Sequence, residues 1–122
     1  MAAVASVVSI VLFLAFLTAG LQKVLFTPAM SHAAEHLGVT KRLYQRIGVV
    51  EMVAGVAVMV GLVGKGASFT AILNEVAAAG LFALMIGAVV VHRRRSDALA
   101  AYGAALGLGA LALLEVLLRL FA

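Results

Sequence analysis

The sequence predicts an all-α integral membrane protein, an antiparallel four-helix bundle with a short interfacial helix in its first loop. Of its 122 residues, 66% are hydrophobic and 11% are charged, whereas soluble domains are about 45–50% apolar and about 25% charged. The apolar residues form four long continuous stretches and do not alternate as they do in membrane strands. This composition excludes a soluble globular domain, a disordered chain and a coiled coil.

The first apolar stretch predicts a spanning helix over about residues 2–26. About 20 residues are enough to cross a hydrocarbon core of about 30 Å. A cleaved signal peptide is the alternative, but the segment 1–6 carries no basic side chain. The apolar run also exceeds the roughly 7–15 residues of a signal-peptide core. We therefore expect this helix to be retained.

A short amphipathic helix is expected over about residues 28–38. Thr27 suits its N-cap, Pro28 its first position and Gly38 its end. One face is apolar and the other largely polar, as in a helix that lies on a membrane surface. The apolar face carries Met30, Ala33, Ala34 and Leu37, and the polar face carries Ser31, His32, Glu35 and His36.

Three further stretches predict spanning helices over about residues 44–64, 67–92 and 98–121. The whole chain, residues 1–122, is then a single transmembrane domain. Because lipid provides no hydrophobic drive between helices, close packing needs small residues at the contacts. The small residues expected to pack the helices are Gly48, Gly55, Ala79, Ala83, Gly87, Gly103 and Gly107.

The basic residues are distributed unevenly between the two sides. The loop regions 27–46 and 93–97 contain most of them, whereas the opposite side has only Lys65 and Arg119. The positive-inside rule places basic loops in the cytoplasm and therefore puts both termini outside. The same asymmetry accounts for the net charge of +4. We therefore expect the basic residues to contact the lipid bilayer and not to bind nucleic acid.

Five polar residues lie at similar depth near the cytoplasmic side: Gln22, Lys23, Arg46, Glu51 and His92. A charged side chain in the bilayer core costs about 2.5–3.5 kcal/mol or more of insertion free energy, so such residues are expected to have a structural or functional role. They are a candidate pocket for a quinone, a lipid headgroup or a small polar substrate, in which Glu51 and His92 could move protons. The alternative is a structural Lys23–Glu51 ion pair that fixes helix register.

A second polar set lies on the outer side and consists of Asn74, Glu75, Glu115 and Arg119. Glu75 and Glu115 have matching depths in an antiparallel arrangement. Two close carboxylates could share a proton or hold a cation together with Asn74. A salt-bridge cluster with Arg119, one turn from Glu115, is the favoured alternative.

Few cofactor sites are compatible with the residues present. The chain has no cysteine, which excludes iron–sulfur and zinc–thiolate sites. His32 and His36 have a spacing that allows joint metal ligation beside Glu35, but solvent-facing histidines are commoner on an interfacial helix. We therefore expect no metal and no haem, and quinone remains the cofactor to consider.

Three segments resemble the DoxX-like family of small four-helix bacterial membrane proteins over roughly residues 10–110. They are Gly20-Leu21-Gln22-Lys23-Val24, Arg46-Ile47-Gly48-Val49-Val50-Glu51, and Met85-Ile86-Gly87-Ala88-Val89-Val90-Val91-His92-Arg93. Lys23, Glu51 and His92 match the family's polar positions. Asn74, Glu75 and Glu115 are departures from its pattern.

The resemblance implies a bundle in the bacterial cytoplasmic membrane and several classes of function. Relatives of the DoxX-like family include the membrane subunit of thiosulfate:quinone oxidoreductase, membrane partners of secreted redox enzymes, and a distant animal chaperone of receptor assembly. We expect an accessory or assembly subunit of a membrane complex, with redox-linked complexes as one option, that binds a protein partner or forms a homo-oligomer. The alternative is a small membrane enzyme or quinone- or lipid-binding protein that uses the Lys/Glu/His pocket.

Overall fold

The computed structural model describes residues 2–63 and 68–120, which fold into helices joined by short turns. These helices are α1 (Ala2–Leu25), α2 (Pro28–Leu37), α3 (Lys41–Val63), α4 (Ser68–Arg94) and α5 (Leu99–Leu120). Helix α3 begins at Lys41, three residues before the expected start at Tyr44, because the hydroxyl of Thr40 accepts a hydrogen bond from the Leu43 N–H at 3.2 Å. The all-helical class predicted from the sequence is confirmed for the described residues.

The short helix α2 begins and ends as its sequence predicts. The Thr27 hydroxyl accepts a hydrogen bond from the Met30 N–H at 3.4 Å, and Pro28 follows at the first helical position. Gly38 closes the helix in the left-handed conformation with φ of 71°, which a residue without a Cβ adopts readily. The chain can therefore turn sharply on both sides of α2.

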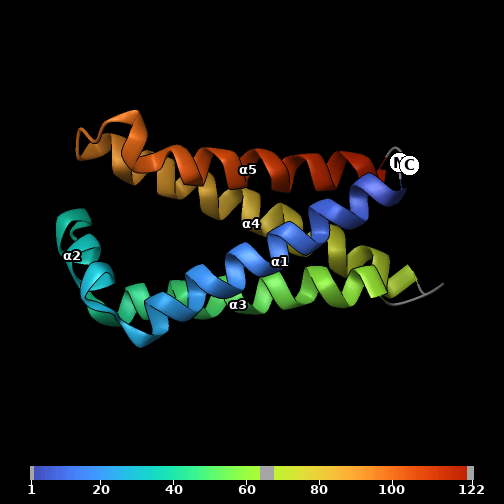
Figure 1. The fold of residues 1–122 in the computed structure, drawn as a ribbon, viewed down its shortest axis with the longest axis horizontal. Helices are drawn as coiled ribbons and strands as arrows, with labels where there is room; N and C mark the ends of the chain where they lie inside the picture. Colours follow the sequence, from blue (N-terminus) through green and yellow to red (C-terminus); the bar gives the residue numbers. More distant parts are fainter. Residues whose placement is uncertain (1, 64–67, 121–122) are drawn as a thin grey trace.

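The four long helices pack in a ring, in which α1 lies along α3, α3 along α4, α4 along α5, and α5 contacts α1 (Figure 1). Successive long helices run antiparallel because short connections join them. Helix α2 and the α4–α5 turn lie at one end of this ring, and the start of α1 and the end of α5 lie at the other (Figure 1).

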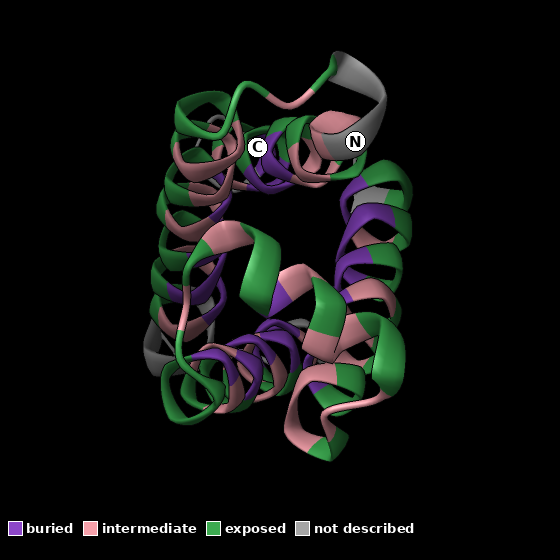
Figure 2. Ribbon diagram, turned by 90° about the vertical axis from the view of Figure 1, so that its left-hand side faces the viewer, coloured by how far each residue is buried: buried purple, intermediate pink, exposed green. Residues whose placement is uncertain are grey.

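Buried residues line the inward faces of the ring and exposed residues cover its outside (Figure 2). The interior contains large apolar side chains such as Leu12, Phe16 and Leu81. The exterior is also apolar, with residues such as Val53 and Val76 each 63% exposed. Monomeric soluble proteins rarely expose continuous apolar surfaces of this kind.

Within the described residues, three helices are long and apolar enough to cross a membrane. Their spans are Ala3–Leu25 in α1, Lys41–Gly61 in α3 and Ile72–Arg94 in α4. The apolar segment found in α5 is shorter and runs over Tyr102–Leu118. Lys65 and the expected ends at residues 64, 67 and 121 lie outside the described residues.

The structure corrects the expected role of several small residues. A Cβ placed on Gly87, Gly103 or Gly107 would meet no atom within 4 Å, apart from the helix's own neighbouring backbone. Ala79 and Ala83 are also exposed. These residues face away from the other helices of the ring, because α4 and α5 contact their neighbours through their other faces. The prediction that they pack helices within this chain is therefore wrong.

Candidate functional site

Helices α1 and α3 approach most closely where Gly20 meets Gly48. A Cβ on Gly48 would lie 2.6 Å from the carbonyl oxygen of Gly20, and a Cβ on Gly20 would overlap the carbonyl oxygen of Gly48. The two backbones therefore touch at a point where neither helix has room for a side chain. The sequence pattern predicts Gly48 as a packing residue but not Gly20, although Gly20 opens the motif that carries Lys23.

The close approach brings Lys23 and Glu51 together. Each lies three residues after one of the contacting glycines, and a separation of three places both on the same helix face as that glycine. The Lys23 Nζ lies 2.7 Å from the Glu51 Oε1. The Glu51 side chain is 2% exposed and that of Lys23 is 17% exposed, so the two form a buried ion pair with its cation at the edge.

An aromatic cover lies over the cationic partner. The Lys23 Nζ is 5.5 Å from the centre of the Tyr44 ring, a distance at which the ring face attracts a cation. Tyr44 is buried, its hydroxyl donates to the Met30 Sδ at 3.8 Å, and the Phe26 ring meets it edge-on with centres 6.5 Å apart. The corner between α1 and α3 thus covers the ion pair from the α2 end of the ring.

His92 belongs to a different cluster at the same end of the ring. Its Nδ1 lies 2.7 Å from the Asp97 Oδ2, and the His36 Nε2 lies 2.6 Å from the Asp97 Oδ1. The His92 ring also stacks at a tilt against Tyr102, with centres 6.2 Å apart. The contacts of His92 are therefore with the α4–α5 turn and the start of α5, and the structure does not bring it to Lys23 and Glu51 as the expected pocket requires.

The Asp97 cluster ties α2 to the turn between α4 and α5. The Arg95 Nη2 adds a hydrogen bond to the Leu37 carbonyl at 3.3 Å. Hydrogen bonds with His92 and then His36 lower the pKa of Asp97 below its ordinary value of 3.8. The amphipathic pattern predicts a solvent-facing His36 and gives no role to Asp97, although an acidic residue five positions after His92 is a usable signal.

The other members of the two predicted sets are dispersed. Gln22 and Arg46 are exposed at the α2 end of the ring. On the other side, the Asn74 Nδ2 donates to the Val58 carbonyl at 2.9 Å, joining α4 to α3. Glu115 is fully buried and accepts a hydrogen bond at 2.5 Å from Ser9, a residue of α1 that sequence analysis missed.

Glu75 is half-buried in α4, and the side chain of Arg119 lies outside the described residues. Asn74 and Glu115 therefore connect two different pairs of helices. Asn74 ties α4 to α3, and Glu115 ties α5 to α1, each by a side-chain hydrogen bond.

The family model described as the DoxX-like family matches residues 7–115. The chain belongs to the DoxX-like family. This confirms the resemblance inferred from the three motifs. Neither the curated proteins nor the solved structures gave a match. Membership of the DoxX-like family and the three apolar helices together indicate a membrane protein.

In this DoxX-like protein, we expect the Asp97→Asn substitution to free α2 from the α4–α5 turn. The two histidines contact different carboxylate oxygens, and an amide replaces one of these acceptors with an NH2 donor and removes the negative charge, so it cannot hold both histidines as the carboxylate does. A nitroxide on an introduced cysteine at exposed Ala29 should become more mobile, and the chain has no native thiol to compete for the label. Glu35→Gln, which removes an exposed carboxylate from α2 itself, is the matched control and should leave the spectrum unchanged.

The same label should report a pH dependence of defined sign. Because the pKa of Asp97 is lower in the folded protein than its ordinary 3.8, the cluster stabilises the docked α2 fully above that ordinary value. The stabilisation is lost as the pH falls through the lowered pKa. The label should therefore stay immobile from pH 7 down to about 4 and be released only at lower pH. Release already at pH 5 would contradict this assignment.

Proposed function

We propose that this chain is an integral protein of the bacterial cytoplasmic membrane, spanned by α1, α3, α4 and α5. The apolar exterior of the ring supports this placement, as does the length of α5, whose 22 residues extend about 33 Å at 1.5 Å per residue. The exposed basic side chains Lys41, Arg42, Arg46, Arg93, Arg94 and Arg95 gather at the α2 end. The positive-inside rule assigns this end to the cytoplasm and the termini to the outside.

Within that membrane, we propose that the chain works as an accessory or assembly subunit of a larger complex, with redox-linked complexes as the first class to test. One observation carries this proposal: Lys23 and Glu51 neutralise each other across the α1–α3 contact. A buried pair held by a glycine contact fixes helix register, which is a structural role. The ionisable groups at this depth thus support the fold.

The outward face of α4 supports a protein partner. Ala79, Gly80, Ala83 and Gly87 are all exposed, and open space lies above the two glycines. In membranes, helices associate through such small residues because backbones can then approach closely. A flat strip of this kind on the outside of the ring is suited to a helix of another subunit.

The test is capture of the tagged full-length chain from its native membranes in mild detergent, with partners quantified by mass spectrometry. We expect Gly80→Leu/Gly87→Leu to reduce the captured partner on the order of tenfold, since two bulky side chains block close approach. The isolated chain should keep its stability, because nothing lies within 4 Å of either added Cβ. Val53→Leu, on the exposed face of α3, is the control.

Two outcomes would contradict the accessory role. Wild-type protein captured without any stoichiometric partner would remove the basis for a subunit. Equal capture by the wild type and the glycine variant would show that the outward face of α4 is not where the partner binds.

A second function, quinone or lipid binding at the ion pair, is favoured by the position of Lys23. Its side chain is 17% exposed at the edge of the pair, so a polar ring or headgroup could reach the part of the ammonium group that Tyr44 leaves uncovered. On this second function, replacement of both charges by methionine preserves the fold and abolishes bound quinone. On the accessory function, the same variant preserves both the fold and the captured partner.

A further inference from the structure

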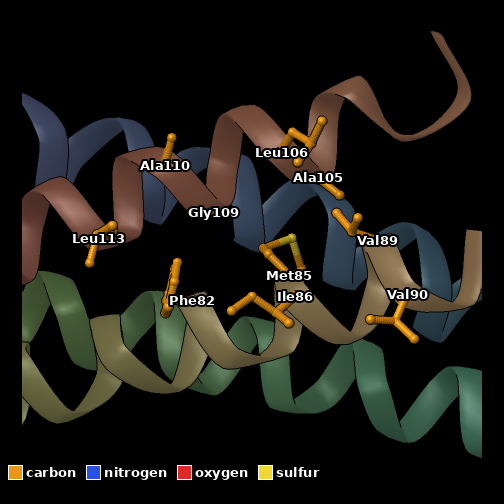
Figure 3. A pocket seen from close by; sticks show the side chains of 10 residues that line it. All are labelled: Phe82, Met85, Ile86, Val89, Val90, Ala105, Leu106, Gly109, Ala110 and Leu113. Carbon is orange, nitrogen blue, oxygen red and sulfur yellow. The ribbon is translucent and has the colours of Figure 1, made fainter. Parts of the chain in front are cut away.

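An apolar groove runs between α4 and α5 on the outside of the ring (Figure 3). Its floor is the contact between Met85 and Gly109, where a Cβ on the glycine would lie 3.2 Å from the Met85 Cβ. Exposed side chains such as Ile86, Leu106 and Leu113 form its rims. The groove has a volume of about 330 Å³, and every side chain that lines it is apolar.

The shape of the groove suits a hydrocarbon chain. On α4 it extends from Phe82 to Val90, which is about 12 Å along a helix that rises 1.5 Å per residue. Its floor is Gly109 on α5. A wholly apolar groove of this length accepts a segment of an extended acyl chain without leaving a polar group unpaired.

The groove ends at a cluster of positive charge. Arg93 lies four residues after Val89 and three after Val90, and Arg94 lies four after Val90, so each arginine follows a residue of the groove lining by one turn of α4. Both arginines are exposed. On α5, Tyr102 lies one turn before Ala105 and Leu106. Two basic residues of α4 and a tyrosine of α5 therefore lie one turn beyond the groove, at the end that faces the α4–α5 turn.

The nearby acidic group is engaged elsewhere. Asp97 is the acidic residue of this turn, and its two carboxylate oxygens bind His36 and His92. It therefore holds α2 and leaves the charge of Arg93 and Arg94 available to an outside anion. Guanidinium groups bind phosphate oxygens strongly and in bidentate geometry.

We propose that this groove binds an anionic phospholipid, with one acyl chain between α4 and α5 and the phosphate on Arg93 and Arg94. The site is separate from the Lys23–Glu51 pair, and it rests on the membrane placement given under the proposed function. The apolar groove selects a lipid tail, and the basic end selects an anionic over a zwitterionic headgroup. In the proposed orientation that end lies at the cytoplasmic leaflet, where anionic lipids attract basic residues.

The test is native mass spectrometry of the full chain in neutral detergent, with phosphatidylglycerol and phosphatidylcholine of identical acyl chains in competition. The wild type should retain phosphatidylglycerol preferentially. Arg93→Gln/Arg94→Gln should reduce this preference on the order of tenfold, since each basic residue near the surface favours anionic lipid by a few-fold. Arg42→Gln/Arg46→Gln removes two exposed charges at the same end of the ring but on α3, and should leave the preference unchanged.

A second pair of variants tests the groove itself. Ala110→Phe places a ring on an exposed residue that lines the groove and should displace both lipids. Ala104→Phe adds the same ring to an exposed residue of α5 that is not part of the lining, and should leave lipid binding intact. The proposal is overturned if the arginine variant keeps the preference, or if Ala110→Phe binds lipid as the wild type does.

Two controls separate this proposal from others. Flotation of the chain with lipid vesicles tests the membrane placement alone, so a chain that floats but shows no headgroup preference refutes only the lipid site. A wild-type dimer that Ala110→Phe converts to a monomer, with lipid binding unchanged, would assign the groove to a second copy and overturn the proposal.

Discussion

We expect the Lys23→Met substitution to lower the free energy of unfolding by about 3–5 kcal/mol, the range for breaking one side of a buried ion pair. Methionine matches the four-atom stem of lysine without its ammonium, and it leaves Glu51, with a 2% exposed side chain, as an uncompensated charge. The reciprocal Glu51→Met should be less harmful. Lys23 is 17% exposed, and a long cationic side chain can move its head to the interface.

The double variant Lys23→Met/Glu51→Met should recover most of this loss, because apolar replacement of a buried pair is often neutral or stabilising. The measurement is unfolding in mixed micelles of increasing SDS fraction, followed by energy transfer between dyes on cysteines introduced in α1 and α4. The same samples report bound quinone and captured partner. Equal loss for both single variants, or no recovery in the double variant, would contradict the ion-pair assignment.

Sequence reasoning located the features that depend on local chemistry. Helix α2 follows from Thr27, Pro28 and Gly38, whose capping preferences act over a few residues. The Lys23–Glu51 pair follows from depth alone. Two opposite charges at the same height in an apolar chain are strongly favoured to meet, because each is costly without the other.

The features that sequence reasoning missed depend on which way each helix face turns. In a soluble helix the apolar stripe marks the inward face. In this chain the exposed faces are as apolar as the buried ones, as Val53 and Val58 on α3 show. Hydrophobic periodicity therefore could not tell that Gly87 points outward or that Glu115 points to Ser9. The position of His92 depends on Asp97, which lies in the α4–α5 turn. The path of that turn depends on its contacts with α2.

The close contact between Gly20 and Gly48 leads to the second large effect. We expect Gly48→Ala to lower the free energy of unfolding by about 1–3 kcal/mol, the usual range for overpacking a tight contact. The added Cβ would lie 2.6 Å from the Gly20 carbonyl oxygen and 2.7 Å from the Lys23 Cβ, so α1 must move away. Because the obstructing oxygen belongs to the backbone, a change of rotamer cannot relieve the overlap.

The matched control for Gly48→Ala is Gly80→Ala, where the new Cβ meets no atom within 4 Å. Alanine is the better helix former by about 0.5–1 kcal/mol, so this variant should be neutral or slightly more stable in the same SDS titration.

The Gly48 effect should also be coupled to the ion pair, since separation of α1 from α3 pulls Lys23 away from Glu51. In the Lys23→Met/Glu51→Met background the loss caused by Gly48→Ala should therefore shrink, as expected for residues in contact. An undiminished loss in that background would show that the glycine contact and the ion pair act independently, and would refute the inference that one positions the other.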